Sequence, residues 1–284
     1  MTTGGDSVIR VVSSGRVDFS HNASIYDRRH GTLLSPESSQ RLAAAASLEP
    51  GARVLDIGAG TGRVAIALAS LGCRVVAVDP ARPMLQELVK KTTSTIVACV
   101  VGEGSRLPVA SNTADALVIA RLLYLAPDWR DIVSESVRVL KRDGRLLREW
   151  SNGTDDEEWV QIRERIRGMF EREGIANPFH PGARSEGDVD AELRNHGMTV
   201  DGEVALGPGQ LMTADLFVKR IVDGECSYTW TVPHDVAARC LPELARWTAE
   251  RFDLTREVPM PREIVWRIYR KRSPAIDNLE SEVR

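Results

Sequence analysis

The chain has 284 residues, with 37 Lys and Arg against 40 Asp and Glu, so its formal net charge is −3. Hydrophobic residues make up 43% of the sequence and charged residues 27%, which is typical of a globular protein and excludes a disordered or fibrous chain. The length allows one large domain or two small ones. The charge balance gives no general attraction to nucleic acid.

No apolar stretch is long enough to predict a membrane span, and the first ten residues lack the basic region and apolar run of a signal peptide. We therefore expect a soluble, cytoplasmic protein with no membrane partner. The four cysteines form no CxxC pair, and no cluster of His, Asp or Glu has metal-ligand spacing. We expect no metal site.

The first 50 residues start with a polar stretch and continue into a helix predicted over 36–48, with Ser35 as its N-cap. From 51 to 150, short apolar runs bounded by turn residues alternate with helical patterns. Strands are predicted at 53–57, 74–78, 96–101, 116–120 and 145–150, and helices at 62–71, 83–91 and 128–140. This alternation predicts a parallel sheet covered on both faces.

Beyond Trp150 the alternation stops. Helices are predicted at 155–173, 188–196, 213–222 and 233–252, the last interrupted by Pro242, and strands at 198–206 and 263–270. A loop rich in Gly and Pro covers 174–187. The polar tail, 273–284, is expected to be flexible.

The most informative segment has the sequence VLDIGAGTGR. A predicted strand ends in an acid, Asp56, and the chain then turns through Gly58, Gly60 and Gly62 into a helix. Glycines allow unusual backbone angles and let a ligand approach the main chain closely. Asp79 ends the next strand, 21 positions after Gly58, where an acid can accept hydrogen bonds from both ribose hydroxyls of an adenosine ligand.

Two adenosine ligands compete for this pattern. The dinucleotide fingerprint GxGxxG requires a third glycine at position 63, where this chain has Arg63. S-adenosylmethionine (SAM) has no pyrophosphate, and its ammonium and carboxylate groups suit an acid and exposed backbone groups. The spacing GxGxG, preceded by an acid, therefore favours SAM and leaves an NAD-dependent dehydrogenase as the weaker alternative.

Residues 53–150 resemble a class I SAM-dependent methyltransferase of the small-molecule type, similar to the ubiquinone and menaquinone methyltransferases. The segments that carry the resemblance are VVAVDPARPML, VGEGSRLP and ARLLYLAPDW, with FSHNASIYD upstream. The resemblance implies an α/β fold, a Rossmann-like, doubly wound, mostly parallel seven-stranded sheet with helical insertions near the carboxyl ends of its strands. It also implies in-line transfer of a methyl group from SAM to a small-molecule acceptor, with S-adenosylhomocysteine (SAH) as product.

The resemblance further implies which residues bind SAM. Asp79 would hold the ribose, and Glu103 with Gly104 would contact the adenine, although the family usually has Asp-Ala there. Ala120 and Arg121 would line the methionine end of the ligand. The full predicted SAM-binding set is Tyr26, Asp56, Gly58, Ala59, Gly60, Gly62, Asp79, Pro80, Met84, Glu103, Gly104, Ala120 and Arg121.

These expectations define a domain plan. Residues 1–50 would form a helical segment that closes over the ligand through Tyr26 and Asp27, and 51–150 the SAM-binding core. Residues 151–272 would complete the sheet, with helical lid insertions at 151–187 and 207–255 that exclude water from the site. The sequence identifies no catalytic base; Tyr26, His30 and Tyr124 are the weak candidates.

Two further alternatives stay open. The first is a protein of the same fold that binds SAM or SAH with a regulatory or non-methylating role, because fold does not determine function. The second is a nucleic-acid methyltransferase. The acidic balance disfavours it, as does the segment after the fourth strand, which lacks the Pro-Pro-aromatic and Pro-Cys motifs of that class. We expect no nucleic-acid partner, and either a monomer or a homodimer.

Overall fold

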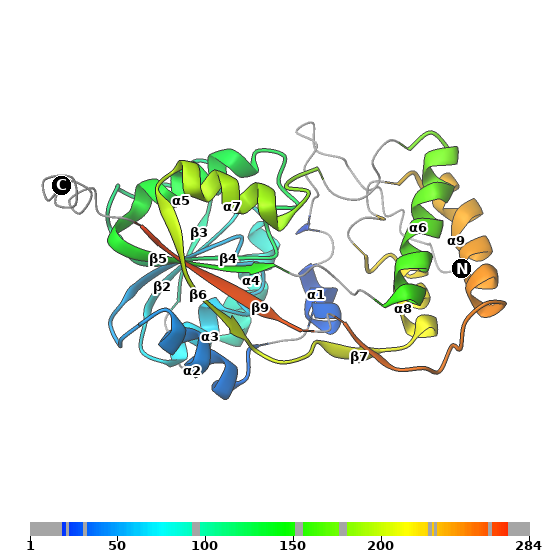
Figure 1. Ribbon diagram of the computed structural model, residues 1–284, viewed down its shortest axis with the longest axis horizontal. Helices are drawn as coiled ribbons and strands as arrows, with labels where there is room; N and C mark the ends of the chain where they lie inside the picture. The colour runs from blue at the N-terminus through cyan, green and yellow to red at the C-terminus, as the bar shows by residue number, and fades with distance from the viewer. Residues whose placement is uncertain are drawn as a thin grey trace, which may run out of the picture.

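The computed structural model describes residues 19–20, 23–30, 33–92, 97–150, 156–175, 181–226, 229, 232–260 and 263–271. Seven strands form one sheet in the order β3-β2-β1-β4-β5-β9-β6 (Figure 1). They are β1 (Arg53–Ile57), β2 (Arg74–Asp79), β3 (Val97–Val101), β4 (Ala114–Ala120), β5 (Leu140–Trp150), β6 (Met198–Ala205) and β9 (Val265–Lys271). β9 runs antiparallel to β5 and β6, and the other neighbouring strands are parallel. The predicted α/β fold with a mostly parallel seven-stranded sheet is confirmed.

Helices cover both faces of the sheet (Figure 1). On one face lie α5 (Trp129–Val139) and α7 (Glu186–Asn195), and on the other lie α2 (Pro36–Ala45), α3 (Ala65–Ser70) and α4 (Arg82–Lys91). The strands alternate between these two cores with a period of two. Leu55 and Ile57 of β1 belong to the core under α5, whereas Val54 belongs to the core under α2 and α3.

Three more helices form a group of their own, which lies beyond α1 (Ala23–His30) from the sheet in Figure 1. These are α6 (Glu157–Arg172), α8 (Ala214–Val222) and α9 (His234–Ala249), joined by a two-stranded ladder of β7 (Gln210–Met212) and β8 (Val258–Met260). They share a separate hydrophobic core in which the rings of Trp159 and Phe217 lie 4.7 Å apart. We call this group the helical unit. The chain between α6 and α8 returns to the sheet, because Val189 and Leu193 of α7 pack in the core under α5.

The structure differs from several of the predicted elements. Strand β5 begins at Leu140 and runs through Asp143 and Gly144, where the sequence predicts a turn before a strand at 145–150. The helix predicted from residue 62 begins at Ala65, because the chain makes turns through 58–64 first. Helix α9 continues through Pro242, which was expected to interrupt it. Proline removes one backbone hydrogen bond, but Leu241 and Leu244 on either side of it are buried in the helical unit and hold the helix together. The short β7 and β8 were not predicted.

None of the described helices is long and apolar enough to cross a membrane.

Candidate functional site

The turn between β1 and α3 places three glycines at the carboxyl edge of the sheet. Gly58, Gly60 and Gly62 have φ angles of 67°, 55° and 86°, in the left-handed region that favours glycine. A Cβ on Gly62 would lie 2.5 Å from Cγ of Leu88, so a side chain here would force the loop and α4 apart. The N–H of Gly58 donates to the carbonyl of Val78 at 2.8 Å, which fixes the loop to the end of β2.

Two buried acids stand at the strand ends beside this loop. Asp56 is 2% exposed, and burial raises its pKa to about 7 although Arg63 opposes the shift. Asp79 accepts a hydrogen bond from the N–H of Gly60 at 2.9 Å and another from the N–H of Ala81 at 2.8 Å. Burial raises the pKa of Asp79 to about 6, even though both hydrogen bonds favour the ionised form. Near neutral pH, ionised Asp79 therefore holds the glycine loop in place.

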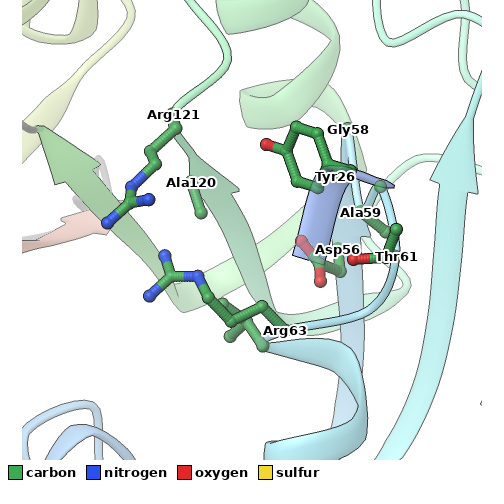
Figure 2. A pocket seen from close by; sticks show the side chains of 10 residues that line it. Tyr26, Asp56, Gly58, Ala59, Thr61, Arg63, Ala120 and Arg121 are labelled. Atoms are coloured by element: carbon green, nitrogen blue, oxygen red, sulfur yellow. The ribbon is translucent and has the colours of Figure 1, made fainter. Parts of the chain in front are cut away.

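A pocket of about 430 Å³, open to solvent, lies at this loop (Figure 2). Its lining consists of Tyr26, Asp56, Gly58, Ala59, Gly60, Thr61, Arg63, Val64, Ala120 and Arg121. These residues come from α1, the end of β1, the glycine loop and the end of β4. Ligands of open α/β sheets bind at this carboxyl edge of the strands.

The lining contains seven of the predicted SAM contacts: Tyr26, Asp56, Gly58, Ala59, Gly60, Ala120 and Arg121. The other six are Gly62, Asp79, Pro80, Met84, Glu103 and Gly104, which lie outside the lining. Asp79 bonds to Gly60, and Cε of Met84 lies 3.3 Å from the place that a Cβ on Gly60 would take. Pro80 and Glu103 are exposed, while Gly104 is buried where a Cβ would lie 2.7 Å from Cγ2 of Ile57.

Three lining residues were missed by sequence reasoning: Thr61, Arg63 and Val64. Thr61 and Arg63 belong to the glycine motif and Val64 follows it directly, so the motif indicates where these three lie. Arg63 was used only as an argument against a dinucleotide. Its contact in the folded protein joins it to a residue 86 positions away, which no local pattern indicates.

That contact belongs to a cluster of three charges on the β4 and β5 side of the pocket. The carboxylate of Glu149, on β5, is fully buried between Arg63 and Arg121. Nε of Arg121 lies 2.7 Å from Oε1 of Glu149, and Nη2 of Arg63 pairs with Oε2. Burial alone would raise the pKa of Glu149, but the two guanidinium groups hold it below its usual range. Figure 2 shows both guanidinium groups on the same side of the pocket, away from Asp56.

Helix α1 is attached to the site through Asp27, the neighbour of Tyr26. Thr61 donates its hydroxyl to Oδ1 of Asp27 at 2.5 Å, and Nζ of Lys91 lies 2.6 Å from Oδ2. The first bond ties α1 to the glycine loop and the second ties it to the end of α4. The ring of Tyr26 also packs edge-on against Phe19, with 6.0 Å between the centroids.

A family profile described as "Methyltransferase domain" matches residues 55–147. The matched range contains the glycine loop, Asp79, Glu103 and Arg121. Residues 55–147 are therefore a methyltransferase domain.

Relatives resemble this methyltransferase domain over part of their length. An uncharacterized methyltransferase of Mycobacterium tuberculosis strain H37Rv is 35% identical over 132 residues, which cover 45% of this chain and 53% of the relative. A demethylmenaquinone methyltransferase of Corynebacterium glutamicum strain R is 38% identical over 99 residues, which cover 35% of this chain and 41% of the relative. The chain therefore spans about half the length, or less, of these relatives.

The crystal structure of the YcgJ protein from Bacillus subtilis superimposes with a TM-score of 0.57 at 18% identity. The match covers 84% of this chain and all of that protein. At this identity the similarity concerns the fold alone. It extends beyond the methyltransferase domain defined by the family profile.

The three candidate catalytic residues differ in position: Tyr26 lines the pocket, Tyr124 lies near Arg121, and His30 ends α1. Burial lowers the pKa of Arg121, but Glu149 and then Tyr124 and Tyr26 raise it above its usual value, so both tyrosines lie near its guanidinium group. Tyr26 lines the pocket. His30 is the last residue of α1, and its side chain lies outside the described part of the structure. Within the described ranges, no three His, Cys, Asp or Glu side chains are grouped so as to hold a metal ion.

Proposed function

We propose that this protein transfers a methyl group from SAM to a small-molecule acceptor. The observation that carries the proposal is the glycine loop, in which the left-handed Gly58 and Gly60 expose the main chain to a pocket beside two buried acids. This loop lies inside the segment that matches the methyltransferase profile. A SAM ligand combines an adenosine, a sulfonium and an amino-acid end, and the carboxyl edge of the sheet offers a suitable group for each.

The ribose would bind to Asp79. Each carboxylate oxygen of Asp79 already accepts one backbone N–H, and a carboxylate has about four acceptor positions, so capacity for two hydroxyl donors remains. The adenine would lie toward Glu103 and Gly104. The amino-acid end would lie over the glycine loop, where buried Asp56 supplies negative charge for the ammonium group and the backbone N–H groups supply donors for the carboxylate.

The acceptor would enter between the sheet and the helical unit. Methyl transfer by in-line displacement requires the acceptor atom, the methyl carbon and the sulfur to be aligned, so positioning and exclusion of water contribute much of the acceleration. The helical unit, with its own core, supplies the bulk for such a lid, and α1 supplies Tyr26. A small-molecule acceptor is supported by the name of the Corynebacterium relative, a demethylmenaquinone methyltransferase.

The first experiment is a calorimetric titration of the purified protein with SAM, SAH and NAD in parallel. We expect micromolar affinity for SAM and SAH and no heat with NAD. Asp79→Asn should lower the affinity for SAH at least about tenfold, because it weakens charge-assisted bonds to two hydroxyls. Asp143→Asn is the matched control, since Asp143 is exposed and pairs with Arg270 at 2.9 Å on the opposite end of the sheet.

Binding of SAH that Asp79→Asn leaves unchanged would refute our placement of the ribose. Binding of NAD alone would refute the assignment of the ligand class. If SAM binds, incubation with methyl-labelled SAM and a panel of small acids, phenols and amines then tests transfer. SAM binding with no label transferred to any acceptor class would favour the regulatory alternative.

A further inference from the structure

The charge cluster on the β5 side of the pocket has more cations than anions. Arg63 and Arg121 both pair with Glu149, whose pKa is held low. Their side chains are 15% and 16% exposed, whereas that of Glu149 is fully buried beneath them. The surface that a ligand meets here is therefore cationic. Among the described residues that line the pocket, the only acid is Asp56, which stands at the end of β1, away from the two guanidinium groups.

The location of the cluster separates it from the adenosine end of the site. The order of strand ends along the carboxyl edge is β2 with Asp79, then β1 with Asp56, then β4 with Arg121, then β5 with Glu149. The arginines thus stand at the far end from the ribose position. Figure 2 shows their guanidinium groups on the opposite side of the pocket from Asp56, with the hydroxyl of Tyr26 pointing in their direction.

The backbone of Arg121 is strained in the conformation that directs its side chain toward Glu149. Its φ is 53°, in the left-handed region that L-residues with long side chains rarely adopt. The strain occurs directly after β4, where the chain turns the side chain toward Glu149 on the neighbouring strand. Tyr124, three residues on, also lies close enough to influence the guanidinium group electrostatically.

We propose that Arg63 and Arg121 determine the class of methyl acceptor, by selecting a small molecule with an anionic oxygen at or beside the attacked atom: a carboxylate, phenolate or enolate. This inference rests on the proposed function. A bound SAM adds a positive sulfonium to a pocket that is already cationic on this side, and an anionic acceptor balances both charges. The amino-acid end of SAM is a poorer partner, because its ammonium group would be repelled by the pair that attracts its carboxylate.

The same charge makes a separate base unnecessary for transfer to oxygen. The two guanidinium groups favour the ionised acceptor, whose proton is released to solvent on binding. A lone pair of the anionic oxygen then forms the O–C bond while the electrons of the C–S bond pass to sulfur. The products are a neutral methyl ester or ether and SAH, and no proton leaves the acceptor in the transfer step.

The test uses matched anionic and neutral probes on the full chain saturated with SAH. Benzoate is titrated against benzamide, and acetate against acetamide in case the larger ring does not fit, with binding followed by ligand-observed NMR. We expect each carboxylate to bind at least about tenfold more tightly than its amide, since bonds between charged groups are the strong ones. Arg63→Met should abolish this preference while SAH affinity changes less than about threefold. Arg121→Met should abolish it as well, and its SAH affinity is measured in parallel because Arg121 belongs to the predicted SAM contacts.

Arg142→Met is the matched control, because Arg142 is exposed at the other end of β5 and should leave both preferences unchanged. Retained SAH affinity establishes that Arg63→Met is folded, and a urea unfolding transition like that of the wild type does so for Arg121→Met. If neither carboxylate binds better than its amide to the wild-type protein, the proposal is wrong. It is also wrong if both arginine variants lose SAH affinity but keep affinity for 5′-methylthioadenosine, because the pair then holds the carboxylate of SAM itself. If the wild-type protein binds no SAH, the proposed function fails, and the same probes without SAH still decide whether the arginines select an anion.

Discussion

Replacing Glu149 by Gln should destabilise the protein by about 3 kcal/mol, although Glu149 lies outside the segments that carry the sequence resemblance. Its carboxylate has no exposure and contacts two guanidinium groups, one at 2.7 Å. Breaking a buried ion pair costs about 3–5 kcal/mol, because it leaves an uncompensated charge in a poorly solvated place. The lower end applies here, since Gln keeps one oxygen for one arginine and both arginines are about 15% exposed. The free energy of unfolding of a typical protein is about 5–15 kcal/mol, so the expected loss is a large fraction of it.

The assay is urea unfolding at a series of pH values, comparing wild type with Glu149→Gln. Because the pKa of Glu149 is lowered in the folded protein, its contribution is complete above the ordinary Glu pKa of about 4.3 and is lost as the pH falls through the folded pKa. The difference between the two proteins should therefore be constant from pH 8 to about 5.5 and shrink below about pH 4.3.

A matched control separates this effect from that of removing any carboxylate. Glu243→Gln breaks an ion pair at 2.6 Å between α9 and Arg165 on α6, in which the side chains are 51% and 31% exposed. Exposed pairs contribute at most about 1 kcal/mol, so this variant should unfold close to wild type. A loss below about 1 kcal/mol for Glu149→Gln, or a loss that does not change down to pH 3.5, would refute the reasoning from burial.

Three further outcomes follow from the geometry of the loop and its neighbours. SAH affinity of the wild type should fall at least about tenfold from pH 7 to pH 5, because the pKa of Asp79 is about 6 and the ionised form accepts the ribose hydroxyls. In calorimetry on Asp79→Asn, only the dependence due to Asp56, whose pKa is about 7, should remain. Gly60→Val should abolish SAH binding and lower Tm, since φ is 55° and its Cβ would stand 3.3 Å from Cε of Met84. Gly182→Ala should lower the free energy of unfolding by more than about 1 kcal/mol, because its Cβ would lie 2.0 Å from a backbone oxygen, whereas Gly187→Ala has room and should not.

The sheet could be predicted from the sequence because its strands are buried and sharply bounded. β1 has the predicted limits, since an apolar run is stopped by glycine after Ile57 and preceded by a turn at Gly51. The helical unit was less predictable. Strands β7 and β8 have three residues each and show no alternation, and β8 contains Pro259. Their pairing depends on contacts between segments about 50 residues apart, which local patterns do not report.

In the candidate site, too, the residues of a local motif were predictable and a residue positioned by strand pairing was not. Asp56, Gly58 and Gly60 were predicted as contacts because they belong to one local motif, and they line the pocket together. Glu149 was not predicted, because its role arises only when β5 lies beside β4 and brings its end next to Arg121. The sequence predicts a strand at 145–150 that contains Glu149. Only the pairing of β5 with β4 brings the Glu149 carboxylate between Arg63 and Arg121.

The segment after β4 is held from two sides, which links acceptor geometry to both halves of the protein. On the sheet side, Glu149 fixes Arg121. On the other side, the chain returning from the helical unit donates the N–H of Gly182 to the carbonyl of Tyr124 at 3.0 Å and the N–H of Ala183 to that of Leu123 at 2.9 Å. Neither bond involves the glycine loop or Asp79. A displacement of the 181–183 segment therefore changes the position of Tyr124 without passing through the groups assigned to SAM, so acceptor turnover should respond to such changes while SAH affinity does not.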